Sequence, residues 1–431
     1  MTRFGRIRLL HTIISTETIK PSSSTPSHLK THMLSVLDHI APNIHLPWLF
    51  FYQNYKNNDI EILKKSLSQS LTHYHTFAGR HPSPFAPHID CNDKGVVFME
   101  ASNDRKLDDF INIKDEHDKT LDQLIPNSLG CANNKSSPNM MEVQLNHFTC
   151  GGAALVVTIS HKVADAFTMV KFMNHWANVA RGGSAYPTSF SSYIGDMKLL
   201  ERLAAAVQLQ PKREEVKLAT KRFVFPNSKL HELKRKINAI CATPVNPSRV
   251  ESLSSLLYKC AVDAAATISS CFQPSSLTTV VNLRNKVEGT LIPDSTVGNF
   301  VMGATAKMAD SNQIKWDYVI TSLRKEIMEL RGSKDNEELD KKVAKNMLSI
   351  VNNRSRNYVA TSVCRFPFYQ VDFGWGKPVL VILRSENTGG DLFVLMDAPH
   401  TDGIEATVQL DEKEMAIFQK DKELLAYVED I

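Results

Sequence analysis

The 431-residue chain lacks the features that mark secreted, zinc-binding or membrane-spanning proteins. Its seven cysteines are an odd number, lie scattered along the chain and form no Cys-x-x-Cys pair, so neither a disulfide framework nor a zinc site is indicated. No segment approaches roughly eighteen consecutive apolar residues, the length that a transmembrane helix needs. These absences favour reduced thiols, a cytoplasmic location and no membrane partner.

An excess of charge of one sign is also missing. The 50 Lys and Arg residues against 46 Asp and Glu residues leave a formal net charge of +4. So small an excess does not indicate nucleic-acid binding. It is compatible only with a local basic patch around an anionic ligand. Residues 1–14 carry three arginines, but their apolar part is too short for the core of a signal peptide. We expect a disordered or edge extension there rather than a transit peptide.

The length of the chain predicts two domains, because single hydrophobic cores seldom grow beyond about 250–300 residues. Between the halves, residues 182–216 change from Gly-, Pro- and Ser-rich to charged, which is typical of a crossover segment. Apolar patterns predict strands over 48–52, 96–100, 141–148, 153–159, 222–225, 278–283 and 379–383. Helical patterns cover 60–71, 101–136 and 312–350 and begin near 165, 228 and 248.

One strand-to-helix junction brings a histidine to the end of a rigid element. Residues 153–159 form a short Val- and Ile-rich run bounded by two glycines, as expected of a buried strand. From Asp165 onward, apolar residues recur at helical spacing. His161 therefore lies where the strand ends, and catalytic groups are held most accurately on rigid elements.

His161 and Asp165 form a His-x-x-x-Asp pattern that no other histidine of the chain repeats. The pattern alone is weak, since fifteen histidines make a chance match unsurprising. The alternative without chemistry is a satisfied polar His161 and an Asp165 that caps the helix or forms a buried ion pair. A metal site is not favoured, because the sequence places no further His or carboxylate that would complete the coordination.

Residues 372–376 read DFGWG and form a second distinctive segment. Asp-Phe-Gly also opens the magnesium motif of protein kinases, but no Gly-rich loop or His-Arg-Asp loop precedes it here. Gly374 and Gly376 around Trp375 predict a tight turn that places the indole against a neighbour. Taken alone, the segment indicates structure rather than chemistry.

Together and in this order, the two motifs resemble the plant BAHD acyltransferases, which transfer an acyl group from coenzyme A to an alcohol or amine. The resemblance covers residues 15–425 and includes the segments 25–26, 34–38, 77–80, 91–95, 150–152, 282–284, 297–299, 364–365 and 403–405. The chain is most similar to the branch that holds vinorine synthase, deacetylvindoline acetyltransferase and salutaridinol acetyltransferase. That branch mostly acetylates hydroxyls of alkaloids and related specialised metabolites.

The resemblance implies an α/β fold of two chloramphenicol-acetyltransferase-like domains, each a mixed β-sheet with helices, with a channel between them. We place the N-terminal domain, which carries His-x-x-x-Asp, at residues 1–190 plus about 372–392. The crossover loop is expected at 191–215, and the C-terminal domain at 216–371 plus about 393–431.

The resemblance also implies the roles of the site residues. His161 lies in the middle of the channel as general base, and an imidazole suits this task at neutral pH. Asp165 pairs with Arg284 and orients His161 rather than transferring protons. The indole N–H of Trp375 is a candidate donor to the oxyanion. The remaining motif residues, Asp372, Gly374 and Gly376, support the geometry of the domains.

The ligands follow from the same resemblance. We expect acetyl-coenzyme A as co-substrate, a small-molecule alcohol as acceptor, no permanently bound cofactor, no metal and a monomeric protein. Ser248 at a helix N-terminus suits a phosphate or pantetheine contact, with Arg249 and Lys259 as further candidates for binding coenzyme A.

Rival interpretations keep the fold and change the activity. Peptide-synthetase condensation domains and carnitine acyltransferases also carry His-x-x-x-Asp, but the intact DFGWG segment argues against both. A non-catalytic acyl-CoA-binding paralogue is disfavoured because His161, Asp165 and Arg284 are all retained. Malonyl or longer acyl donors stay open.

Overall fold

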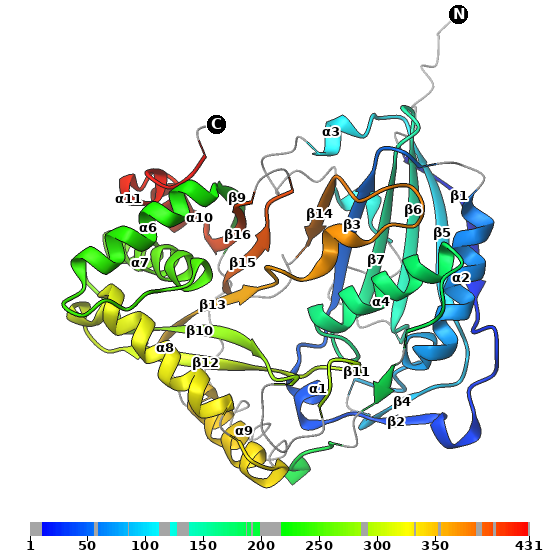
Figure 1. Ribbon diagram of the computed structural model, residues 1–431, viewed down its shortest axis with the longest axis horizontal. Helices are drawn as coiled ribbons and strands as arrows, with labels where there is room; N and C mark the ends of the chain where they lie inside the picture. Colours follow the sequence, from blue (N-terminus) through cyan, green and yellow to red (C-terminus); the bar gives the residue numbers. More distant parts are fainter. Residues whose placement is uncertain are drawn as a thin grey trace, which may run out of the picture.

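The computed structural model describes residues 11–55, 59–84, 86–111, 121–126, 138–186, 188–190, 193–198, 217–285, 292–331, 333–351, 355–384, 390–399 and 402–429. These residues fold around two six-stranded sheets, one built mainly from the first half of the chain and one from the second (Figure 1). Both sheets are mixed, because each contains parallel and antiparallel neighbours.

The first sheet has the strand order β1–β5–β6–β7–β3–β14. The pair β5 and β6 is parallel, and the other neighbours are antiparallel. In this order the strands are β1 (His11–Ile19), β5 (Val96–Asn103), β6 (Met141–Phe148), β7 (Ala153–Ser160), β3 (His45–Tyr52) and β14 (Leu380–Leu383). The central strand β7 is buried along its whole length.

Alternate residues of β7 face two different cores, as the pleat of a strand requires. Leu155 and Val157 pack into the cluster that contains Trp176 of α4 (Ala166–Ala180). Ala154 and Val156 pack into a second cluster on the opposite face. The helix α2 (Ile60–His73) lies beside α4 on the first face, and α3 (Asp108–Ile111) lies on the second. Burial on both faces explains the continuous apolar run in the sequence.

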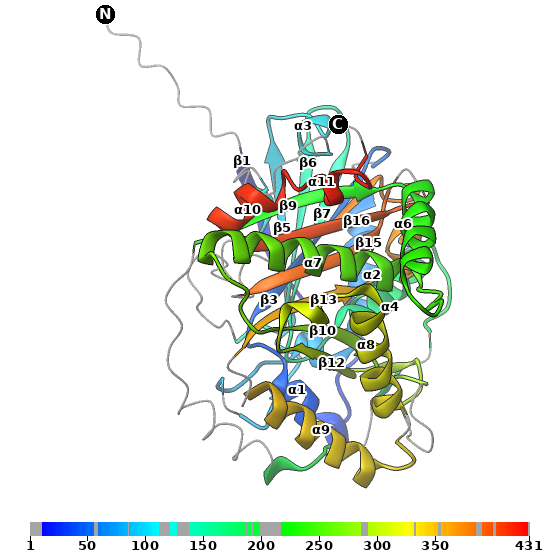
Figure 2. The same ribbon diagram turned by 90° about the vertical axis from the view of Figure 1, so that its left-hand side faces the viewer.

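The second sheet has the strand order β12–β10–β13–β15–β16–β9. Its strands are β12 (Val301–Met308), β10 (Ser275–Asn282), β13 (Arg356–Ser362), β15 (Asp391–Asp397), β16 (Ile404–Asp411) and β9 (Leu218–Phe225). Several helices pack against it, and Figure 2 shows them in front of the sheet. They are α6 (Asn227–Ile240), α7 (Arg249–Ser269), α8 (Trp316–Arg331), α10 (Glu412–Phe418) and α11 (Lys422–Leu425), and α9 (Asn336–Val351) follows α8.

Two connections tie the sheets together. After β13 the chain leaves the second sheet, adds β14 to the edge of the first sheet beside β3, and returns to the second sheet as β15. In addition, Val36 and Leu37 of the short helix α1 (Val36–Ile40) pack against Leu283 and Phe300 from the second half. We call this group the interface cluster. Its further buried members are Tyr193, Val281, Ile292, Met302, Ala304, Leu330, Leu339 and Val343.

Two small sheets complete the described structure. Strand β2 (Thr31–Met33) pairs with β4 (His88–Asp90), and β11 (Thr296–Val297) pairs with β8 (Ser189–Phe190). The second pair again connects the two halves, and α1 lies beside it (Figure 1). The segment after β11 leads directly into β12 and contributes most of the contacts from the second half to the site described below.

The predicted α/β fold of two mixed sheets with helices is confirmed. The predicted limits of the two domains stay a prediction, and most of the predicted crossover loop, residues 191–192 and 199–215, lies outside the described residues, as do residues 1–10. The prediction of a helix over 101–136 is wrong for those of its residues that the structure describes. Strand β5 continues to Asn103, because Ala101 and Asn103 are buried beside β6, and α3 has only four residues.

The edge extension predicted for residues 1–14 is seen in part, because the described residues from His11 onward form the edge strand β1. The single helical stretch predicted over 312–350 is two helices, α8 and α9. Among the helices of the described ranges, none is long and apolar enough to cross a membrane. These same ranges contain no group of three or more His, Cys, Asp or Glu residues that could hold a metal ion.

Candidate active site

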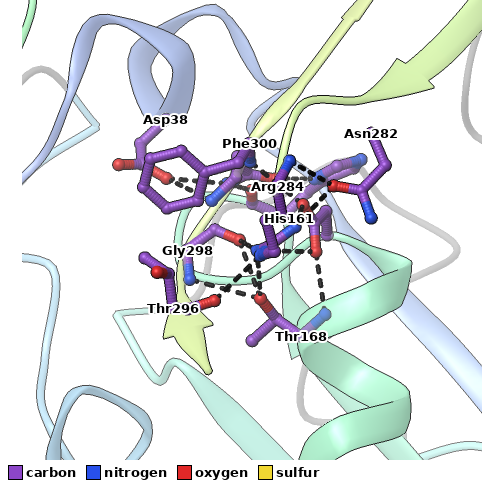
Figure 3. Close-up of polar contacts among 10 residues, drawn as sticks. Asp38, His161, Thr168, Asn282, Arg284, Thr296, Gly298 and Phe300 are labelled. Carbon is purple, nitrogen blue, oxygen red and sulfur yellow. Dashed lines mark hydrogen bonds and ion pairs between the residues drawn. The ribbon is translucent and has the colours of Figure 1, made fainter. Parts of the chain in front are cut away.

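His161 follows the last residue of β7 and lies at the junction of the two halves (Figure 3). Its backbone N–H donates to the carbonyl of Ile44 at 2.8 Å, so the segment before β3 fixes the turn. The side chain is half-buried. Its Nδ1 atom lies 3.0 Å from Oδ1 of Asn299, which comes from the segment between β11 and β12. The strand therefore supplies the imidazole, and the other half of the molecule supplies its hydrogen-bond partner.

The hydrogen bonds of Asn299 determine which nitrogen of His161 carries the proton. The amide Nδ2 of Asn299 donates to the carbonyl of His161 at 2.7 Å and to Oδ1 of Asp38 at 3.0 Å. Since both partners are acceptors, the amide is fixed in this orientation and its Oδ1 faces the imidazole. Nδ1 of His161 must then donate, which leaves Nε2 as the unprotonated nitrogen of the neutral ring. This is the tautomer that a general base needs.

Asp38 is the anchor of this arrangement. The carboxylate is buried at the start of α1, where Ser35 is the N-cap and Asp38 completes a capping box. One oxygen accepts from the backbone and side-chain N–H groups of Asn299, and the other accepts from the backbone and hydroxyl of Ser35. Helix α1 therefore holds Asn299, which in turn orients His161.

Asp165 and Arg284 form a buried ion pair across the junction of the halves. Asp165 is the N-cap of α4, and its Oδ1 accepts from the backbone N–H of Thr168 at 2.8 Å. Its Oδ2 accepts from Nη1 of Arg284 at 2.8 Å and from the backbone N–H of Phe300 at 3.0 Å. Both carboxylate oxygens are occupied, and the side chain points at Arg284 rather than serving as a proton acceptor.

Arg284 contacts several carbonyls in addition to Asp165. Nε donates to the carbonyl of Thr296 at 3.0 Å, and Nη2 donates to the carbonyl of Gly298 at 2.8 Å. Gly298 has a φ angle of +125°, which favours glycine, and a Cβ atom there would lie 3.4 Å from Oδ1 of Asp38. The guanidinium therefore fixes the segment 296–300 against α4, and the glycine lets this segment pass close to α1.

The pKa directions agree with this division of roles. Burial alone would raise the pKa of Asp165, but the Arg284 guanidinium and the surrounding hydrogen bonds hold it below its usual value. Asp165 is therefore ionised at neutral pH. Burial lowers the pKa of His161 below its ordinary 6.5 and outweighs the hydrogen bonds and the Asp165 carboxylate, which act in the opposite direction. The imidazole is accordingly neutral at pH 7.

The structure does not place Trp375 at His161. The DFGWG segment forms a tight turn in which Gly374 and Gly376 have positive φ angles and both donate to Oδ1 of Asp372. The indole N–H of Trp375 already donates to Asp59 at 2.9 Å. Its ring packs edge-on against Tyr52.

The register of the first sheet shows how far this turn lies from the base. Tyr52 pairs with Ala153 at one end of β7, whereas His161 follows Ser160 at the other end. Seven residues at about 3.4 Å each separate the two ends by about 24 Å. The prediction that Trp375 stabilises the oxyanion is therefore not supported, and the packed turn holds α2 and β3 together instead.

The predicted coenzyme A contacts are spread along α7. Ser248 is its N-cap and forms a capping box with Glu251. Arg249 donates to the carbonyl of Asp402 at 2.6 Å. Lys259 lies eleven residues beyond Ser248, about 16 Å along the helix, and pairs with Glu423 at 2.7 Å. The structure thus does not bring Lys259 to Ser248, and all three roles in binding coenzyme A stay predictions.

Sequence reasoning assigned no role to Asn299, Asp38, Thr168 or Gly298. In the sequence, the segments 34–38 and 297–299 stand out only as parts of the family resemblance. One local signal was available, because Ser35-x-x-Asp38 fits a capping box at a helix start. No local signal indicates that Asp38 reaches Asn299, which lies 261 residues away in the sequence.

Three comparisons place the chain among known proteins. The family model described as "Transferase family" matches residues 10–425. Limonoid 1-O-acetyltransferase of Citrus sinensis is 34% identical, over 96% of this chain and 97% of the relative. A 17,18-epoxy-17-hydroxycur-19-ene N-malonyltransferase of Strychnos nux-vomica is 33% identical, over 96% and 90%. The crystal structure of vinorine synthase has a TM-score of 0.78 at 27% identity, and the match covers 97% of this chain and 98% of that one.

We expect Trp375→Phe to lower stability and to leave catalysis per folded molecule intact. The substitution removes the hydrogen bond to Asp59 but keeps an aromatic ring in the packed turn. The bond is part-buried and Asp59 stays partly accessible to water, so its loss should cost about 0.5–1.5 kcal/mol. Thermal unfolding and the turnover number of the folded fraction measure the two effects. A fall in turnover at unchanged melting temperature would instead indicate that Trp375 acts at the reacting centre.

We expect Asp165→Asn to lower both stability and activity. It leaves Arg284 buried without its counter-ion, and a broken buried pair costs about 3–5 kcal/mol. Asp391→Asn is a matched control, because it breaks a part-buried pair with Arg356 that lies within the second half alone. The control should lower the melting temperature but leave turnover of the folded fraction unchanged. An Asp165→Asn protein with wild-type melting temperature and an altered pH profile would instead make Asp165 part of the proton chemistry.

Proposed function

The chain belongs to the transferase family of BAHD acyltransferases, and we propose from this premise that it transfers an acetyl group from acetyl-coenzyme A to a hydroxyl of a plant specialised metabolite, an alkaloid or terpenoid alcohol. Membership in this family makes the protein an acyl-CoA-dependent transferase. The single observation that carries the mechanism is the hydrogen bond from Nδ1 of His161 to Asn299, which leaves Nε2 free of a proton.

In the proposed reaction, Nε2 of His161 removes the proton of the acceptor hydroxyl while that oxygen attacks the thioester carbonyl of acetyl-coenzyme A. A carbon–oxygen bond forms and gives a tetrahedral intermediate. Collapse of the intermediate breaks the carbon–sulfur bond, and the proton passes from His161 to the departing thiolate. The products are the acetyl ester and free coenzyme A. No covalent acyl-enzyme is needed in this sequence.

Acetyl and hydroxyl are the preferred choices for donor and acceptor, because the relative from Citrus sinensis is named a 1-O-acetyltransferase. The relative from Strychnos nux-vomica is named an N-malonyltransferase, so a malonyl donor is the alternative. A non-catalytic acyl-CoA-binding protein is a second alternative. The oriented neutral His161 disfavours it, since a binding protein needs no base in a fixed tautomer.

We also propose that the enzyme acts as a monomer in the cytoplasm without a permanently bound cofactor. Cys150 and Cys271 are exposed and free, and none of the cysteines in the described residues forms a disulfide. Free exposed thiols suit a reducing compartment. The channel through which both substrates would reach His161, and the coenzyme A contacts of Ser248, Arg249 and Lys259, belong to the same proposal.

The proposal is tested by incubating the purified protein with acetyl-coenzyme A, malonyl-coenzyme A and a panel of alkaloid and terpenoid alcohols. Release of free thiol reports turnover, and product mass identifies the group transferred. A product that is heavier than the alcohol by one acetyl group supports the proposal. If thiol is released with malonyl-coenzyme A but not with acetyl-coenzyme A, malonyl-coenzyme A is the donor. Binding of acyl-coenzyme A without transfer to any acceptor would favour the non-catalytic alternative.

We expect His161→Ala to reduce turnover by about 10²–10⁴-fold, the usual contribution of a general base. His231→Ala is a suitable control, because His231 is an exposed histidine whose Nδ1 contacts the carbonyl of Asn227 in its own helix, α6. Near wild-type turnover in folded His161→Ala protein would refute the assignment of the base.

The pH profile is a further test of His161. Transfer needs the neutral imidazole, so activity should be full above the pKa of His161 and should fall as pH drops through it. Because burial lowers that pKa, the acid limb of log kcat/KM should lie below pH 6.5, the value of an ordinary histidine. The limb is measured from initial rates at low substrate concentration. An acid limb above pH 6.5 would contradict the lowered pKa of His161.

Direct transfer predicts a ternary complex, because the hydroxyl and the thioester must meet beside His161. Initial-rate lines at several fixed acceptor concentrations should intersect, and acetyl-coenzyme A alone should give no acetylated protein by mass spectrometry. Parallel lines with acetylated Ser160, which directly precedes His161, would indicate a covalent intermediate instead. Cys150 lies before the opposite end of β7 and is too distant to relay the acyl group.

A further inference from the structure

Lys162, the residue after His161, is an unusual buried cation. Only 6% of the Lys162 surface is exposed to solvent. Lysine is almost never fully buried unless it is paired, yet no carboxylate within the described ranges forms an ion pair with it. Its ammonium donates instead to three backbone carbonyls, those of Ala41 at 2.6 Å, His39 at 2.8 Å and Asp38 at 3.4 Å. A lysine ammonium has three N–H donors, so each can be satisfied.

The three carbonyls lie at the C-terminal end of α1 and just beyond it. The last carbonyls of a helix have no partner within the helix, and burying them without a donor is costly. Lys162 supplies these donors at the end of α1. The side chain thereby fixes the helix to the turn that carries His161, because residues 161 and 162 are neighbours in the chain.

Helix α1 then closes a ring of contacts back to the base. The carboxylate of Asp38 holds Asn299, and Asn299 accepts from Nδ1 of His161. The same helix packs in the interface cluster through Val36 and Leu37. A shift of its C-terminal end would therefore move both the partner of the imidazole and the contact between the halves.

We propose that Lys162 is a positioning residue for acyl transfer, whose buried ammonium clamps the end of α1 and so fixes Asn299 and the ring of His161. The inference rests on the proposed function, in which His161 is the base. Lys162 does not touch the reacting atoms in this role. It acts through α1, Asp38 and Asn299.

The charge of Lys162 has a second effect on the same base. The titratable groups that face it are Asp38 and His39 of α1, His81 before β4, and His161. Burial is the main cause that lowers the pKa values of these three histidines, and the Lys162 ammonium lowers each of them further. Removing the cation should therefore raise the pKa of His161.

Lys162 itself titrates near the working range. Burial lowers its pKa to about 8, although the Asp38 carboxylate acts in the opposite direction. As pH rises through that value, the side chain loses its charge and one of its three donors, so one of the three carbonyls loses its hydrogen bond. The clamp is complete at neutral pH and weakens in alkaline solution.

The test compares Lys162→Gln with Lys162→Arg, and Lys94→Gln serves as a control at an exposed lysine. Gln keeps two donors without a charge, whereas Arg keeps the charge. We expect Lys162→Gln to lower kcat by about 10- to 100-fold, a loss typical of a misplaced reacting group, with KM for both substrates nearly unchanged. Its acid limb should move to higher pH, and Lys162→Arg should restore much of the rate and the position of the limb.

A second measurement does not depend on turnover. The imidazole pKa of His161 is followed by NMR in histidine-labelled protein, and its signal is assigned by its absence in His161→Gln. We expect the pKa to rise in Lys162→Gln and to stay near the wild-type value in Lys162→Arg and Lys94→Gln. An unchanged His161 titration in folded Lys162→Gln protein, or a rate loss that only follows the folded fraction, would overturn the inference.

These outcomes separate the inference from the proposed function. If the wild-type protein transfers no acyl group but its His161 titration responds to Lys162→Gln, the proposed function fails and the coupling of Lys162 to His161 stands. If wild-type transfer is confirmed while Lys162→Gln keeps the wild-type rate, pH profile and His161 pKa, the clamp fails and the proposed function stands.

Discussion

The ion pair between Asp165 and Arg284 is the contact on which the rest of the site depends, because it joins the two halves where the base is held. Removing two charges from water is expensive, and attraction offsets this cost only when the remaining hydrogen bonds are also satisfied. Here Asp165 also accepts from Thr168 and Phe300, and Arg284 also donates to two carbonyls. Such a pair adds little to stability compared with apolar packing, but it disfavours any placement of the halves that would leave either buried charge unpaired.

The segment 296–300 links this placement to the chemistry. Its carbonyls accept from Arg284, its Phe300 N–H donates to Asp165, and Asn299 between them orients His161. The base therefore reaches its tautomer only when the halves are assembled, since its partner comes from the opposite half. This arrangement explains why a short segment with a glycine at φ +125° lies at the centre of the site.

The sequence predicted the elements whose signals are local. The strand β7, the start of α4 at its Asp165 cap and the buried run of β3 all follow from apolar spacing and a capping residue. The partner of Asp165 was expected only through the family resemblance, because Arg284 lies 119 residues away. Asn299 and Lys162 had no local signal at all, since their roles arise from contacts with α1. Trp375 shows the converse case. Its turn was predicted, but its place beside Tyr52, at the end of the first sheet remote from His161, depends on strand register, which apolar patterns do not fix.

The partner of Nδ1 in this site is an amide rather than a carboxylate, and this choice affects the base. A carboxylate at Nδ1 would hold the same tautomer but would also stabilise the charged imidazolium and raise its pKa. The neutral Oδ1 of Asn299 fixes the tautomer with a smaller electrostatic effect. The carboxylate of Asp165 raises the pKa of His161 and the ammonium of Lys162 lowers it, so the two charges act in opposite directions while burial keeps the ring neutral. The site thus holds an imidazole that is neutral at pH 7 and whose Nε2 is free to accept a proton.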